Sequence, residues 1–132
     1  MLVRILFADD TTETLDLFSL VFALEGFHTR TASNGVEALA AVIESAEPFD
    51  VIVLDIEMPH MDGWQALKAI RMLPQGKQVP IVMFTGYGGE MRARAIQEGA
   101  NRLVHKPLLP QELVQVLREV QEQGVAQGMA SC

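Results

Sequence analysis

The sequence predicts an α/β fold in which a five-stranded parallel sheet carries helices on both faces. Three observations lead to this prediction. Short apolar runs alternate five times with segments of helical spacing, which is typical of a parallel sheet. The chain has 132 residues, about the length of one domain. Hydrophobic residues make up 49% of it, enough for a substantial core.

Five short segments are predicted as strands, at residues 2–7, 27–32, 51–54, 80–84 and 102–105. The first, third and fourth are almost wholly apolar, as strands that are covered on both faces must be. The second alternates apolar and polar residues and the fifth is short and mixed, which suits the edges of a sheet. This composition predicts the strand order 2-1-3-4-5, the flavodoxin-like (βα)5 arrangement.

Apolar residues at helical spacing predict a helix after each strand. Asn34 with Glu37, and Asp62 with Gln65, have the spacing of N-cap pairs, and Pro110 suits a first helical position. A weaker helix is predicted at about 89–98. The apolar residues that mark the other helices are Leu15, Phe18 and Phe22, then Val36, Leu39, Ala40 and Ile43, then Trp64, Leu67 and Ile70, and last Leu113, Val116, Leu117 and Val120.

Composition excludes several classes of protein. Ten Lys and Arg against 17 Asp and Glu give a net charge of −7, which argues against direct binding of nucleic acid or of an anionic membrane. Apolar runs stay well below the ~18 residues of a membrane span. The single cysteine, Cys132, predicts a reducing, cytoplasmic location. We expect one domain over 1–123 and a flexible tail or linker over 124–132.

Polar residues follow the ends of four predicted strands. Asp9 and Asp10 follow the first strand, Asp55 the third, Thr85 the fourth and Lys106 the fifth. In open α/β sheets, ligands bind beyond the carboxyl ends of the strands, where the strand order reverses. The first and third strands are neighbours at that point, so we expect the three carboxylates to converge there.

Three converging carboxylates need a cation, because each would otherwise raise the pKa of its neighbours. Oxygen ligands of this kind favour Mg²⁺, which brings the sum of three carboxylates and one lysine from −2 to zero. Asp55 could then take a phosphoryl group, with the Lys106 ammonium and the Thr85 hydroxyl on the phosphoryl oxygens.

Each of these residues also has an ordinary structural explanation. Asp9 and Asp10 could form a helix N-cap and a solvated loop, since Asp10 and Glu13 have capping-box spacing. Thr85 alone is a common strand residue, and Lys106 with the following proline could be an exposed turn. Only their joint occurrence at four strand ends favours a phosphoryl-transfer site.

With these motifs, the sequence from about residue 3 to 122 resembles a CheY-like receiver domain of two-component response regulators. The segments that carry the resemblance are Asp9-Asp10, 55–63, Leu67, Ile70-Arg71, Thr85-Gly86, Gly99-Ala100 and Lys106-Pro107. The resemblance implies that Asp55 accepts a phosphoryl group from a phosphohistidine on a histidine kinase or histidine phosphotransfer protein. It also implies that Mg²⁺ binds Asp10, Asp55 and the backbone carbonyl of Glu57 directly, and Asp9 through water.

The resemblance further assigns Thr85 and Lys106 to the phosphoryl oxygens. It implies a cis peptide bond between Lys106 and Pro107, a conformation that only X-Pro bonds adopt at modest cost. Gly86 would leave room for the phosphoryl group. Such a protein is a switch that acts on a downstream protein and catalyses only its own phosphorylation and dephosphorylation.

Five positions modify this expectation. Leu103 stands where many receivers carry an aromatic residue that turns inward, so an aromatic flip cannot be the output signal here. Asn101-Arg102 replaces an acidic pair that is frequent in dimerising regulators, and we expect a monomer or a weak dimer. Glu57 and Tyr87 are expected to flank the entrance and to restrict the water that hydrolyses the phosphoryl group.

The first helix carries a second apolar stripe of Leu17, Leu20 and Leu24. An exposed stripe would suit docking on a histidine-bearing helical bundle, as receivers typically use this helix. The last helix could equally cover it.

The sequence argues against two other functions of this fold class. A haloacid-dehalogenase-like phosphatase needs an Asp two residues after its nucleophile, but Thr11 and Thr12 follow the first-strand pair. In an FMN-binding flavodoxin, Asp9 and Asp10 would repel the phosphate. Within the receiver class, the chain is expected to stand alone; the alternative is a receiver excised from a regulator with a DNA-binding or enzymatic output domain.

Overall fold

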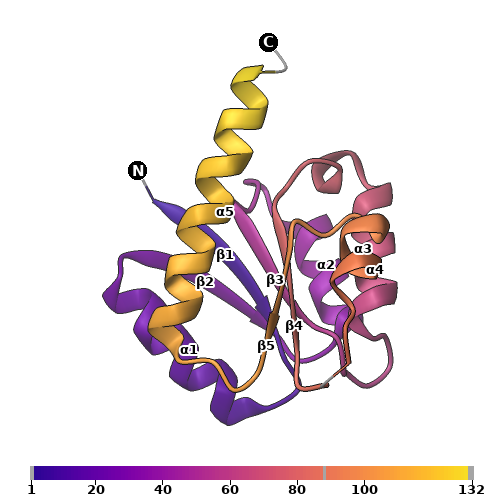
Figure 1. Cartoon of the computed structure of the whole chain (residues 1–132). Coiled ribbons are helices and arrows are strands. Elements are labelled where there is room, and N and C mark those ends of the chain that lie inside the picture. Colours follow the sequence, from indigo (N-terminus) through magenta and orange to yellow (C-terminus); the bar gives the residue numbers. More distant parts are fainter. Residues whose placement is uncertain (1, 88, 131–132) are drawn as a thin grey trace.

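The computed structural model describes residues 2–87 and 89–130, with side chains described up to residue 123. Its five strands form one parallel sheet in the order β2-β1-β3-β4-β5, which confirms the predicted order (Figure 1). The strands are β1 (Val3–Ala8), β2 (Phe27–Ala32), β3 (Val51–Asp55), β4 (Ile81–Thr85) and β5 (Arg102–His105).

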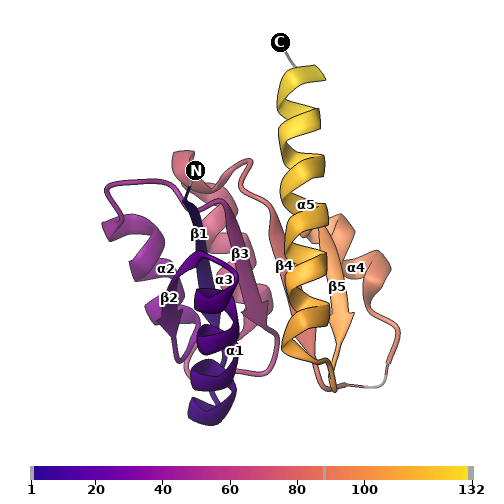
Figure 2. The ribbon, with the colours of Figure 1, turned by 90° about the vertical axis from the view of Figure 1, so that its left-hand side faces the viewer.

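Helices cover both faces of the sheet. α1 and α5 pack on one face, and α2, α3 and α4 pack on the other (Figures 1 and 2). The helices are α1 (Thr12–Leu24), α2 (Gly35–Glu44), α3 (Gly63–Met72), α4 (Arg92–Glu98) and α5 (Pro110–Ala130), with the short 3₁₀ helix η1 (Pro74–Gly76) after α3. Each predicted strand is thus followed by a helix, as expected.

The two layers of core follow from the alternation of side chains along the strands. In β1, Ile5 and Phe7 face α1 and α5, whereas Leu6 and Ala8 face the other three helices. Phe7 lies 5.5 Å from Phe18 of α1, measured between ring centroids. Because the carboxyl ends of β1, β3 and β4 are buried on both faces, the residues just beyond these strands are held in place.

The buried face of α2 differs from the predicted one. Val36 and Ile43 are 50% and 56% exposed. Gly35 donates its amide to Met61 O, and a Cβ at Gly35 would lie only 2.4 Å from that oxygen. Because the two backbones come this close, the face of α2 that carries small side chains packs against the sheet. The buried residues of α2 are Gly35, Ala38, Ala41 and Val42.

Arg71, near the end of α3, ties together the segments on either side of β4. Its guanidinium donates to the carbonyl oxygens of Gly76, Val79 and Gly99 and to Oδ1 of Asn101. Burial lowers the pKa of Arg71. Asn101 therefore has a structural role here, because its side chain joins β5 to this network.

Two boundaries differ from the sequence prediction or extend it. α4 begins at Arg92, later than the expected start near residue 89, and α5 continues to Ala130. The domain boundary at residue 123 stays a prediction, and Cys132 lies outside the described residues. Within residues 2–87 and 89–130, the structure contains no helix long and apolar enough to cross a membrane.

Candidate functional site

The predicted acidic residues meet at the carboxyl ends of β1 and β3. In the sheet register, Ala8 pairs with Leu54, so Asp9 and Asp55 follow equivalent positions of neighbouring strands. Carboxylate oxygens of Asp9, Asp10 and Asp55 lie within 4.8 Å of one another. Asp9 and Asp55 are buried and Asp10 is exposed.

Lys106 reaches into this group from the end of β5. Its Nζ donates to Oδ2 of Asp9 and to Oδ2 of Asp55, at 3.1 Å in each case, and lies 4.8 Å from the centroid of the Phe84 ring. Burial disfavours the charged ammonium, but the Asp55 and Asp9 carboxylates outweigh that effect and raise the pKa of Lys106. The lysine therefore stays protonated and compensates one of the three negative charges.

The carboxyl of Asp55 has a raised pKa in this group. Burial raises the pKa of its carboxyl from 3.8 to about 6, and the nearby Asp9 carboxylate adds to the rise; Lys106 and the amide of Glu57 act in the opposite direction. The Glu57 amide donates to Asp55 Oδ1 at 3.2 Å. Three carboxylates and one ammonium leave a charge of −2, and an oxygen-only donor set of that charge suits Mg²⁺.

The structure does not use Asp10 as a helix cap. α1 begins after Thr11, whose amide donates to Oδ1 of Asp9 at 2.8 Å. Both oxygens of Asp9 are thereby engaged, one by Thr11 and one by Lys106. Asp10 remains on the exposed side of the group. This arrangement contradicts the capping alternative, and Asp10 stays accessible, with one long hydrogen bond of 3.5 Å from the Thr11 hydroxyl to its Oδ1.

Thr85 lies at the end of β4 and is fully buried, but its hydroxyl has an unexpected partner. Thr85 Oγ1 donates to Oε2 of Glu57 at 2.9 Å, and the Gly86 amide donates to Oε1 of the same carboxylate at 3.2 Å. The sequence predicts Glu57 at the entrance to the site but does not predict these hydrogen bonds. The spacing of two residues between Asp55 and Glu57 singles out Glu57 in the sequence. Its contact with Thr85 and Gly86 depends on the geometry of the loop that follows β3.

The structure places the other predicted site residues as follows. Leu103 is buried at 3% exposure in the layer under α2, α3 and α4. Lys106 and Pro107 are joined by a cis peptide bond. A Cβ at Gly86 would meet only Lys106 Cδ, at 3.9 Å, so space remains beside this glycine. Tyr87 is 66% exposed and lies at the rim of the site.

The leucine stripe of α1 is exposed. Leu17, Leu20 and Leu24 are 52%, 60% and 79% accessible, so α5 does not cover them. α5 contacts α1 elsewhere, for example through the pair between Arg118 and Glu25 at 2.9 Å. The alternative that the last helix buries this stripe is therefore wrong.

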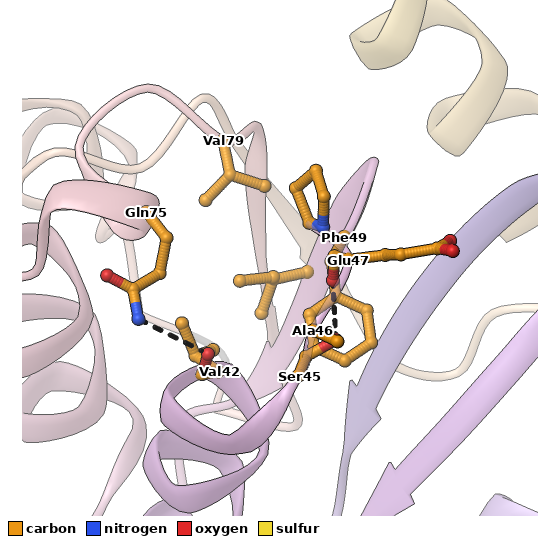
Figure 3. A pocket seen from close by; sticks show the side chains of 9 residues that line it. Val42, Ser45, Ala46, Glu47, Phe49, Gln75 and Val79 are labelled. Atoms are coloured by element: carbon orange, nitrogen blue, oxygen red, sulfur yellow. Dashed lines mark hydrogen bonds between the residues drawn. The ribbon is translucent and has the colours of Figure 1, made fainter.

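Two pockets of about 290 Å³ lie at opposite ends of the sheet. One adjoins the acidic group and is lined by Glu57, Trp64, Tyr87 and other residues. The other lies at the amino ends of β3 and β4, between the end of α2 and the segment before β4 (Figure 3). There Gln75 donates to the Val42 carbonyl, at 3.5 Å. The acidic group at the carboxyl ends is the stronger candidate because it gathers the charged and hydroxyl side chains.

Comparisons with known proteins agree with this geometry. Residues 5–118 match the family model described as response regulator receiver domain. The chain is similar to the transcriptional regulatory protein CpxR homolog of Haemophilus influenzae, with 34% identity over 89% of this chain and 49% of that protein. It thus spans about half the length of that relative. A 14.6 kDa protein from the sodA1 3′ region of Leptolyngbya boryana is also 34% identical, over 87% of each chain.

A solved structure gives the same result for the fold. The chemotaxis response regulator CheY4 of Vibrio cholerae superimposes with a TM-score of 0.84 at 33% sequence identity. The match covers 91% of this chain and 99% of CheY4. The sheet order and the helix positions described above are therefore those of known receivers.

Proposed function

The chain belongs to the response regulator receiver family of two-component systems, and we propose that Asp55 is the residue that accepts the phosphoryl group. The observation that carries this proposal is a buried carboxylate held between a lysine and two further acids at the end of β3. In the reaction, an Asp55 oxygen bonds to phosphorus while the phosphorus–nitrogen bond of a partner phosphohistidine breaks. The imidazole leaves and Asp55 becomes an acyl phosphate.

We propose that Mg²⁺ is held directly by Asp10, Asp55 and the backbone carbonyl of Glu57, and through water by Asp9. The burial of the two neighbouring acids supports this division, because Asp10 is exposed whereas Asp9 is fully buried. When bound, the ion supplies positive charge to a site whose residues sum to −2.

Thr85 and Lys106 are proposed to hold the phosphoryl oxygens. The Lys106 ammonium already donates to Asp55, so it can pair with the negative charge that a phosphoryl group adds there. The space beside Gly86 supports entry of that group. The Thr85 hydroxyl and the Gly86 amide are donors at the same strand end. The chain is proposed to catalyse only its own phosphorylation and dephosphorylation.

The proposed partners are a histidine kinase or histidine phosphotransfer protein, and a downstream protein target. The exposed leucines of α1 support docking of a histidine-bearing helical bundle beside the acidic site. Nucleic acid is not a proposed ligand, because the net charge is −7. The chain is proposed to act in the cytoplasm.

A monomer or weak dimer is proposed from the contacts of β5. Asn101 is engaged by Arg71 and by the Ile81 amide, and Arg102 pairs with Glu119 at 2.9 Å within the same chain. The side chains of Asn101 and Arg102, at the β5 edge of the sheet, are thus already engaged by partners within the same chain. Sedimentation at increasing protein concentration tests the proposal, and a stable dimer of the unphosphorylated chain would contradict it.

Phosphoryl uptake from a small phosphodonor tests the function. The chain is incubated with acetyl phosphate and Mg²⁺, and its intact mass is measured. We expect one added phosphoryl group that is lost in base or hydroxylamine, and none in Asp55→Asn or in excess EDTA. Asp62→Asn is the matched control, because it alters an acid of the same loop and keeps a capping side chain. Turnover of phosphate esters without a stable adduct would instead indicate a phosphatase.

A further inference from the structure

The Glu57 carboxylate lies on the donors at the end of β4. Each of its oxygens has its own donor: Oε2 accepts from Thr85 Oγ1 at 2.9 Å and Oε1 accepts from the Gly86 amide at 3.2 Å. The Thr85 hydroxyl itself accepts from the Tyr87 amide at 3.0 Å. A hydroxyl has a single proton, so the proton of Thr85 is committed to Glu57.

These donors also lie beside Asp55. β3 and β4 are paired, with Asp55 opposite Phe84, so Thr85 is the next residue along the neighbouring strand. The Glu57 amide donates to Asp55 Oδ1, which keeps the two acidic residues together. A phosphoryl group on Asp55 offers only acceptor oxygens, as a carboxylate does. The Thr85 hydroxyl proton can therefore form a strong hydrogen bond to the Glu57 carboxylate or to the phosphoryl group, but not to both.

The negative charge that phosphorylation adds to Asp55 also favours release of the Glu57 carboxylate from Thr85 and Gly86. Phosphorylation changes the charge on Asp55 from −1 to about −2, beside the carboxylate of Glu57. The Lys106 ammonium lies toward Asp9 and Asp55, at 3.1 Å from each. Glu57 also lines the open pocket of about 290 Å³ next to Trp64 and Tyr87, which gives its side chain a place to move.

We propose that the Glu57 carboxylate is an internal stand-in for the phosphoryl group. In the unphosphorylated chain it occupies the Thr85 and Gly86 donors and holds the β4–α4 loop; phosphorylation of Asp55 expels it into the neighbouring pocket. Glu57 therefore opposes phosphorylation and its displacement changes the surface around Trp64 and Tyr87. This inference rests on the proposed role of Asp55.

The test is a binding titration with beryllofluoride, a phosphoryl analogue, in the presence of Mg²⁺. Trp64 is the single tryptophan and lines the same pocket as Glu57, so its fluorescence reports binding. We expect Glu57→Ala and Glu57→Gln to lower the half-saturating concentration about tenfold, since the competing charged acceptor is removed. Glu90→Gln is the control: it removes one exposed negative charge from the β4–α4 loop and should leave binding unchanged.

A second measurement needs no phosphoryl analogue. The amide resonance of Gly86 in the unphosphorylated chain should move in Glu57→Gln and stay in place in Glu90→Gln. Equal or weaker beryllofluoride binding by both Glu57 variants, with normal binding by the unaltered chain, overturns the role of Glu57 alone. If the unaltered chain binds no beryllofluoride, and Asp55→Asn behaves identically, the proposed function falls and the inference falls with it.

Discussion

Replacing Asp55 with asparagine should stabilise the metal-free chain at neutral pH. Asp55 is 1% exposed, and burial followed by the charge of Asp9 raises the pKa of its carboxyl from 3.8 to about 6. The folded chain therefore holds this proton more tightly than the unfolded chain does. The associated stability is fully present below about pH 4 and is lost as the pH rises through about 6.

The magnitude follows from the difference between the two pKa values. At about 1.4 kcal/mol for each unit, a difference of about two units makes ionised Asp55 cost about 3 kcal/mol of folding free energy above pH 7. Asparagine has nearly the same shape and no charge. The variant should thus unfold at higher urea than the unaltered chain at pH 7.5, and at a similar urea concentration near pH 4.

Urea denaturation in EDTA, followed by circular dichroism from pH 4 to pH 8, measures this difference. Adding Mg²⁺ at pH 7.5 should then stabilise the unaltered chain and leave Asp55→Asn nearly unchanged, because the ion relieves the same repulsion. Asp62→Asn again serves as the control. A variant that is less stable than the unaltered chain at pH 7.5, or a difference that is constant with pH, would show that ionised Asp55 does not destabilise the fold.

Three further substitutions follow from the backbone and from Arg71. His60 has a φ of 69°, so His60→Gly should raise the free energy of unfolding by about 1 kcal/mol; a lower urea midpoint would contradict this. At Gly63, a Cβ would lie 2.4 Å from the backbone oxygen of Asp55, so Gly63→Ala should cost about 1–3 kcal/mol and slow phosphoryl uptake, and normal uptake would argue against the contact. Arg71→Met should cost more than about 2 kcal/mol in urea unfolding, since Gly99 O and other carbonyls lose their donor, and a cost below 0.5 kcal/mol (roughly that of a surface site) would count against the network.

The sequence was sufficient for the strand order and for the acidic group, for a physical reason. Strands that are buried on both faces must be apolar throughout, so 51–54 and 80–84 could be told apart from the mixed edge strands. Once the order was known, the residues that follow each strand had to meet at one edge. Asp9, Asp55 and Lys106 were placed in this way, and the structure brings them within hydrogen-bonding distance.

Features that depend on close approach were not predictable. The inward face of α2 is set by the contact of Gly35 with Met61, which no periodicity of apolar residues reveals. Hydrophobicity alone therefore favoured Val36 and Ile43, the exposed side. The bonds from Thr85 to Glu57 likewise depend on how two loops meet after their strands, and neither residue type specifies the partner.

The most direct test of the account is to locate the phosphoryl group on the chain. After incubation with acetyl phosphate and Mg²⁺, borohydride reduction converts an aspartyl phosphate to homoserine, and peptide mapping identifies the residue. We expect homoserine at Asp55 and at no other acid of the site. Homoserine at Asp9 or Asp10, or a phosphoryl group retained by Asp55→Asn, would contradict it.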